Sequence, residues 1–212
     1  MKNRRILMSV LGVVICGISV GIFKIAALGV DPFQTFMSGL DQLIPIPFGT
    51  LYVIANVVLL TFSLIVDRHN IGIATFINLF LLGYITEFSL SVLQIIFPDP
   101  SMPVRVACLI VGIVILCFAS SLYMTADLGV STYDAVSIVM SNKWKIGKFK
   151  YCRIATDLVC VISGCGLFLL GGGKMSAIPT IAGVGTIVTA FFMGPLIEWF
   201  NVKIARPMLE KK

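Results

Sequence analysis

The chain has 212 residues, of which 58% are hydrophobic and only 12% are charged. A soluble globular domain carries about 25% charged residues, so this composition excludes an ordinary water-soluble fold and predicts an integral membrane protein. The net charge of +6 would suit a nucleic-acid partner, but the basic residues lie in short clusters between apolar runs, as in membrane topology signals. We therefore expect the lipid bilayer, and no nucleic acid, as the partner.

Six apolar segments follow one another along the chain. A helix needs about 20 apolar residues to cross about 30 Å of hydrocarbon, and each of the six is of that length. Their approximate ranges are 6–23, 48–66, 71–97, 104–126, 151–170 and 175–200. We predict an all-α polytopic membrane helical bundle that forms a single transmembrane domain over residues 1–212. The basic start also resembles a signal peptide, but five further spans favour a retained anchor.

The Lys and Arg residues are distributed unevenly between the two sides of the predicted membrane. Thirteen of them fall on the side of the N-terminus, and three fall on the other, namely Lys24, Arg105 and Lys174. Because cytoplasmic loops carry the excess of basic residues, this bias predicts that both termini lie in the cytoplasm.

Two sequence elements recur in the second half of the chain. Leu28-Gly29-Val30 recurs as Leu128-Gly129-Val130. The second match keeps all its intervals: Gly72, Thr75, Phe80, Gly83 and Glu87 recur as Gly183, Thr186, Phe191, Gly194 and Glu198. We predict two repeats, about 6–100 and 104–203, which are inverted because each contains three spans. Inverted repeats are common in secondary transporters, although duplication can also produce a passive bundle.

A short extra helix is predicted after the first span of each repeat. Asp31 is a good N-cap and Pro32 fits the first helical position. Ser131 and Asp134 match a capping box. Helices of about ten residues are too short to span the bilayer, so they either re-enter it or lie in its interface. Re-entrant N-termini would offer N–H groups to an anion, whereas interfacial helices would only cap their own backbone.

Three acidic residues fall inside predicted spans. An acid in hydrocarbon usually faces a cavity or a partner, so Glu87, Glu198 and Asp157 are candidates for proton or cation coupling. Glu198 is equally well read as a solvated residue at a helix end. Asn56 corresponds to Asp157 if the alignment shifts by one residue. The polar residues that could line a path or join helices are Gln34, Asn56, Thr75, Asn78, Thr186 and Thr189. The full substrate- or ion-binding hypothesis comprises Glu87, Asp157, Glu198, Asp31, Gln34, Asn56, Ser131, Tyr133 and Asp134.

The patterns typical of metal sites and of common enzymes are missing from the sequence. None of the six cysteines forms a C-x-x-C pair and the chain has one histidine, so we expect no metal site and no cofactor. The G-x-S-x-G match at residues 17–21 lies inside the first predicted span and not at a strand-to-helix turn, so it is no nucleophile elbow. There is also no H-E-x-x-H motif, so we expect that the protein is not an enzyme.

Three segments give the chain a family resemblance. They are 28–33 (Leu-Gly-Val-Asp-Pro-Phe), 127–135 (Asp-Leu-Gly-Val-Ser-Thr-Tyr-Asp-Ala) and 194–200 (Gly-Pro-Leu-Ile-Glu-Trp-Phe). With them the chain resembles the bacterial YczE/YyaS/YitT family of integral membrane proteins, and it is most similar to the YczE branch. The resemblance implies a multi-pass protein of the bacterial cell (inner) membrane without an established biochemical activity.

Three functions are compatible with these features. The leading hypothesis is a small secondary transporter for a small organic solute, coupled in one version to protons or another cation. The first alternative is a non-transporting membrane regulator or scaffold that contacts its partner through the basic stretch 143–148. The second alternative is a substrate-binding subunit of a larger importer. Assembly as a homo-oligomer is compatible with each of them.

Overall fold

The fold was analysed in a computed structural model that describes residues 2–147 and 149–210. Over these residues the chain forms helices joined by turns and contains no strand, which confirms the predicted all-α class. The α-helices are α1 (Lys2–Ala26), α2 (Pro32–Leu43), α3 (Phe48–Val66), α4 (Ile73–Ile96), α5 (Met102–Thr125), α6 (Thr132–Ile138), α7 (Phe149–Leu170), α8 (Ile178–Ile181), α9 (Val184–Phe200) and α10 (Arg206–Glu210). Short 3₁₀ helices cover Arg68–Asn70 and Met175–Ala177, and π-helices cover Val139–Lys143 and Asn201–Ala205.

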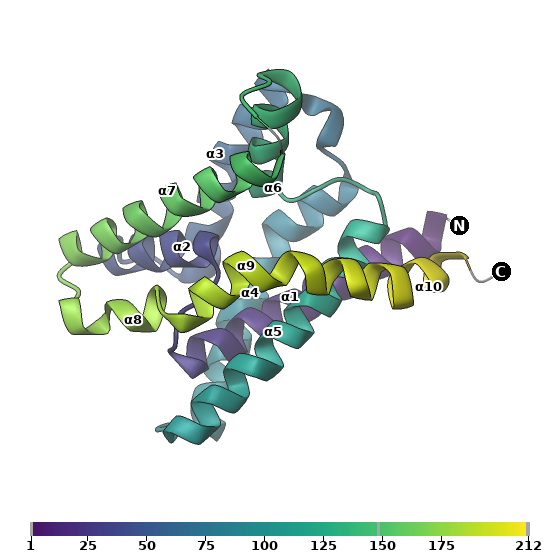
Figure 1. The fold of residues 1–212 in the computed structure, drawn as a ribbon. Coiled ribbons are helices and arrows are strands. Elements are labelled where there is room, and N and C mark those ends of the chain that lie inside the picture. The colour runs from purple at the N-terminus through teal and green to yellow at the C-terminus, as the bar shows by residue number, and fades with distance from the viewer. Residues whose placement is uncertain (1, 148, 211–212) are drawn as a thin grey trace.

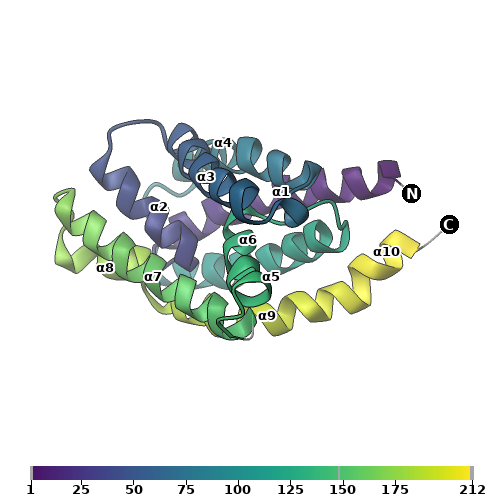
Figure 2. The ribbon, with the colours of Figure 1, turned by 90° about the horizontal axis from the view of Figure 1, so that it is seen from above.

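Six of the described segments are long and apolar enough to cross a membrane, as predicted. They are Asn3–Ala26, Phe48–Val66, Ile73–Ile96, Met102–Thr125, Tyr151–Leu170 and Met175–Met193. Their outer faces are apolar, since Ile65, Ile95 and Leu170 are each about 80% exposed. Such a surface suits lipid and not water. The start of α1 and helix α10 lie at the same end of the molecule, as an even number of crossings requires (Figure 1, Figure 2).

The sixth predicted span differs from the single helix that the sequence suggests. The chain first forms a 3₁₀ turn and α8, then leaves helical geometry at Ala182 and Gly183, and resumes as α9. The physical reason is a close approach of another segment, because a Cβ on Gly183 would lie 2.6 Å from the carbonyl oxygen of Leu28. The interruption therefore creates a helix start inside the bundle.

Helices α1 and α5 are antiparallel at the centre of the fold. Arg5, at the start of α1, donates to the Ala126 carbonyl oxygen and pairs with Asp127, just after α5. Arg105, at the start of α5, donates to the carbonyl oxygens of Ala26 and Ala27 at 2.8 Å each. The first spans of the two halves thus pack side by side and run in opposite directions (Figure 1).

The loops that follow α1 and α5 share an unusual backbone conformation. We call residues 27–31 and 127–131 the two crossover segments. Ala27 and Asp127 have φ angles of 48° and 51°, and Gly29 and Gly129 have φ angles of 99° and 112°. Left-handed values are rare outside glycine, so their recurrence at equal intervals is a shared local structure.

Each crossover segment packs against the third span of the other half. The carbonyl oxygen of Leu28 accepts a hydrogen bond from the Gly185 N–H at 2.7 Å, at the start of α9. The carbonyl oxygen of Leu128 accepts one from the Ala74 N–H at 3.0 Å, at the start of α4. These paired contacts explain why the two sequence matches occur together. The inverted relationship between the two whole halves stays a prediction.

Candidate functional site

The two short predicted helices are present and begin with the predicted caps. Asp31 accepts a hydrogen bond from the Gln34 backbone N–H at 3.1 Å, and Pro32 opens α2. The Ser131 hydroxyl accepts one from the Asp134 N–H at 3.1 Å. The same hydroxyl donates to the Asp134 carboxylate at 2.6 Å, so Asp134 holds the capping hydroxyl of Ser131 in place.

The start of α2 lies inside the protein. Gln34 is 3% exposed and Thr35 is fully buried. The Thr35 hydroxyl donates to the carbonyl oxygen of Ile181 at 2.8 Å, just before the interruption of the sixth span. The N-terminal turn of α2 is therefore in contact with the other half of the chain and not with the outer surface.

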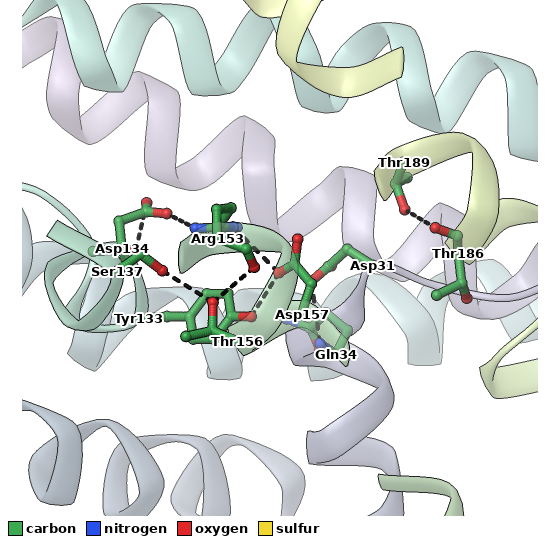
Figure 3. Close-up of polar contacts among 11 residues, drawn as sticks. Asp31, Gln34, Tyr133, Asp134, Ser137, Arg153, Thr156, Asp157, Thr186 and Thr189 are labelled. Atoms are coloured by element: carbon green, nitrogen blue, oxygen red, sulfur yellow. Dashed lines mark hydrogen bonds and ion pairs between the residues drawn. The ribbon is translucent and has the colours of Figure 1, made fainter. Parts of the chain in front are cut away.

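A charged cluster connects the start of α6 with α7. The guanidinium of Arg153 contacts the carboxylate of Asp134, and its Nε lies 3.2 Å from Asp157 Oδ1. The Tyr133 hydroxyl donates to the same Asp157 oxygen at 2.6 Å. The Arg153 Cζ also lies 4.5 Å from the centre of the Tyr133 ring. Arg153 is thus held by two carboxylates and one aromatic face (Figure 3).

Asp31 adds a third carboxylate to this cluster from the first half of the chain. Figure 3 shows it beside Asp157, and the two carboxylates repel each other while Arg153 attracts Asp31. Burial raises the pKa of Asp31 to about 6, and the charge of Asp157 acts in the same direction. Burial likewise raises the pKa of Tyr133, so its phenol stays protonated and acts as a donor to Asp157.

The charges of the cluster do not balance. With all groups ionised, the carboxylates of Asp31, Asp134 and Asp157 face the guanidinium of Arg153, and Lys24 attracts Asp31 but also Asp41 and Glu87. The side chains of Asp157 and Arg153 are 15% and 26% exposed, so solvent screens them only partly. Excess negative charge in such surroundings attracts a proton or another cation.

An apolar cavity of about 590 Å³, open to the outer surface at Val58 and Val159, lies beside the cluster between α2, α3, α6 and α7. Tyr133 and Thr156 line it, together with Phe33, which stacks on Tyr133 with ring centres 4.9 Å apart. A volume of this size falls in the range of pockets that hold small organic molecules, about 300–1,000 Å³. The Tyr133 ring therefore forms part of the cavity wall while its hydroxyl contacts Asp157.

Among the predicted polar residues, Asn56 and Asn78 join helices, and the threonines bond to their own helix or its cap. The Thr132 hydroxyl donates to Asn56 Oδ1, and Asn56 Nδ2 donates to the Tyr52 carbonyl oxygen at 2.8 Å, so this pair joins α6 to α3. The Thr75 and Thr186 hydroxyls accept from the N–H groups of Gly72 and Gly183, and Thr189 donates to the Thr186 carbonyl oxygen. Asn78 accepts from the Tyr52 hydroxyl at 3.4 Å.

The two predicted glutamates, on α4 and α9, contact different partners. Glu87 accepts the Gly49 N–H at 3.0 Å, so it caps the start of α3. The Glu198 side chain is 60% exposed and lies 3.5 Å from Arg206 beyond α9. Glu87 itself lies within α4, whereas Glu198 lies near the end of α9. A coupling role for this pair stays a prediction, and the structure does not bring the two glutamates together.

The cluster contains one functional candidate that sequence reasoning missed, Arg153. In the sequence it is only one of the basic residues on the predicted cytoplasmic side. Its spacing of four residues from Asp157 was the available signal, because such pairs lie on one helix face.

The chain is similar to two known proteins over almost its whole length. It is 23% identical over 194 residues to an uncharacterised protein of Haemophilus influenzae, covering 91% of this chain and 81% of that protein. It is 20% identical over 201 residues to the uncharacterised protein YyaS of Bacillus subtilis, covering 95% and 94%. No solved structure matches it significantly.

The similarity to YyaS agrees with the family resemblance in the sequence, while placement in the YczE branch stays a prediction. Residues 3–202 match the family described as a family of unknown function, DUF6198. The chain therefore belongs to the DUF6198 family.

Proposed function

We propose that this protein is a small secondary transporter of the bacterial inner membrane that moves a small organic solute, coupled to protons or another cation. Both termini lie in the cytoplasm in this proposal, because that side holds most of the Lys and Arg residues. The two halves form an inverted repeat, as the antiparallel packing of α1 and α5 favours. The protein is not an enzyme.

The charged cluster is the observation that carries this proposal. Asp31 comes from the first half, whereas Tyr133, Asp134, Arg153 and Asp157 come from the second. A bundle that only had to be stable would gain little from these groups, since removing charges from water costs about as much as their pairing returns. Intramembrane ionisable groups usually mark a substrate or ion pathway.

The paired crossover segments also favour transport. Each half contributes a loop that docks on a helix start of the other half, through Leu28 with Gly185 and Leu128 with Ala74. Transporters with inverted repeats bind substrate between the repeats and move one against the other. With two equivalent docking contacts, each half could adopt in turn the arrangement that the other half has now, and the binding site between them would open alternately to the two sides.

Reconstitution into liposomes tests the proposal. The protein would be incorporated with a pH-sensitive dye inside, and four radiolabelled solute classes (amines, amino acids, carboxylates and sugars) would be added with and without a pH gradient. We expect one class to enter faster than into protein-free liposomes, with a matching change of internal pH. Asp157→Asn should abolish this uptake.

Asp99→Asn is the matched control, because Asp99 is an exposed loop residue outside the cluster. It should transport like the wild type. Uptake of none of the four classes above the rate of protein-free liposomes would contradict the proposal, and so would wild-type rates in Asp157→Asn.

A further inference from the structure

We propose that the site takes an amphipathic organic cation, with its apolar part in the cavity and its charged group in the place that Arg153 now occupies beside Asp157 and Tyr133. The inference deepens the proposed transport function and rests on it for the location of the site. Its chemistry, however, follows from four separate features of that location.

The first feature is the charge of the cluster. Asp31, Asp134 and Asp157 together carry more negative charge than Arg153 neutralises. An anionic ligand would add to this excess, whereas a monovalent cation would reduce it. Charge complementarity therefore favours a cation.

The second feature is a buried acceptor without a partner. Gln34 is 3% exposed, and its side-chain oxygen has no hydrogen-bond partner among the described residues. Gln34 lies beside Asp31 and Asp157 in Figure 3. A buried acceptor that lacks a donor is costly, and an ammonium group supplies N–H donors whereas a carboxylate supplies none.

The third feature is the apolar cavity. Its lining includes Phe33, Phe36, Leu51, Val136 and Val159, and it reaches the ring of Tyr133. This lining suits a hydrocarbon or aromatic group and offers little to a sugar, whose hydroxyls need hydrogen-bond partners. The stacked rings of Phe33 and Tyr133 also present π faces, which attract cations.

The fourth feature is Arg153 itself. Its guanidinium contacts the Asp157 carboxylate and the face of Tyr133, which are the partners that a cationic ligand would use. It also contacts Asp134, in the first turn of α6, so it can keep one carboxylate after releasing the other. Arg153 is then a tethered cation that neutralises part of the negative charge of the empty site and competes with the ligand.

A series of three small probes tests the charge preference. The compounds 2-phenylethylammonium, 2-phenylethanol and 3-phenylpropionate share a phenyl group and a short chain but differ in charge. Binding to the protein in lipid nanodiscs would be measured by isothermal titration calorimetry. We expect 2-phenylethylammonium to bind, and the neutral and anionic probes to bind at least about tenfold more weakly. Equal or tighter binding of 3-phenylpropionate would overturn the inference.

Variants of Arg153 test its role as the competing cation. Arg153→Gln should tighten binding of 2-phenylethylammonium about tenfold, because the tethered competitor is gone. Arg153→Lys keeps the charge and should restore affinity towards that of the wild type. Arg68→Gln, which removes an equal charge from an exposed turn, should leave affinity unchanged. Weaker binding in Arg153→Gln, in protein with the wild-type elution profile, would show that Arg153 assists the ligand and would overturn the inference.

The nanodisc measurement also separates this inference from the proposed function, because binding needs no translocation. Uptake of a carboxylate solute into liposomes would leave transport in place and refute the cationic ligand. Binding of 2-phenylethylammonium without uptake of any solute would support the ligand class and contradict transport.

Discussion

The Tyr133 hydroxyl donates a hydrogen bond to Asp157 Oδ1 at 2.6 Å, and this bond joins the short helix α6 to the long helix α7. Tyr133 is the second residue of α6, and this seven-residue helix is too short to be stable without tertiary contacts. The bond therefore fixes both the position of α6 and the orientation of the Asp157 carboxylate towards Arg153.

Tyr133→Phe should lower the free energy of unfolding by about 2 kcal/mol, because it removes one hydrogen bond to a charged group while the ring and its stacking on Phe33 remain. Thermal unfolding in detergent would measure the change. Tyr84→Phe is a suitable control, since Tyr84 is about half exposed and its hydroxyl is 3.4 Å from Thr50. A loss no larger than that of Tyr84→Phe would show that the Tyr133–Asp157 bond does not stabilise the fold.

Gly29→Ala and Gly129→Ala should each destabilise the protein by at least about 2 kcal/mol. Left-handed backbone costs a non-glycine residue about 1–2 kcal/mol. The added Cβ would also lie only 2.4 Å from the Gly183 nitrogen in the first case and 2.5 Å from the Gly72 nitrogen in the second.

Gly166→Ala is the control for both crossover variants. A Cβ on Gly166 meets nothing within 4 Å, and alanine favours helix α7, so this variant should be neutral or slightly stabilising. Melting temperatures would be compared by differential scanning fluorimetry. Equal melting temperatures for Gly29→Ala and Gly166→Ala would contradict the described crossover contact.

Asp31 should make stability depend on pH in a defined direction. Because its pKa in the folded protein is about 6, above the ordinary value near 4, the neutral form is favoured on folding. The contribution of Asp31 is fully present below about pH 4 and is lost as the pH rises through about 6.

Asp31→Asn cannot ionise at this position. The melting temperature of the wild type should therefore fall relative to that of this variant as the pH rises from 4 to 7. Asp99→Asn, in an exposed loop, should show no such trend. A difference between wild type and Asp31→Asn that does not vary over this range would show that Asp31 titrates normally.

Much of the fold could be predicted because its determinants are local. Runs of apolar residues of bilayer length fixed the six spans, and Asp31 and Ser131 marked the starts of α2 and α6 by cap chemistry. The repeated glycines were also informative, since only glycine fits the backbone of Gly29 and Gly129 where they meet another segment.

The composition of the site could not be predicted in the same way. Arg153 acquires its role from α6, which packs against α7 and brings Asp134 to it. A basic residue near the start of a span looks the same in sequence whether it faces the cytoplasm or a carboxylate. The repeated match that ends at Glu87 and Glu198 begins at Gly72 and Gly183, which dock the crossover segments. The two glutamates themselves lie in different surroundings, which the equal intervals do not reveal.

Solute uptake into liposomes by the wild type, Asp157→Asn and Asp99→Asn is the most direct test of the central claim, that Asp157 belongs to a transport site. We expect the wild type and Asp99→Asn to accumulate the same solute at the same rate, and Asp157→Asn to accumulate it no faster than protein-free liposomes. Uptake by folded Asp157→Asn at the wild-type rate would contradict the claim.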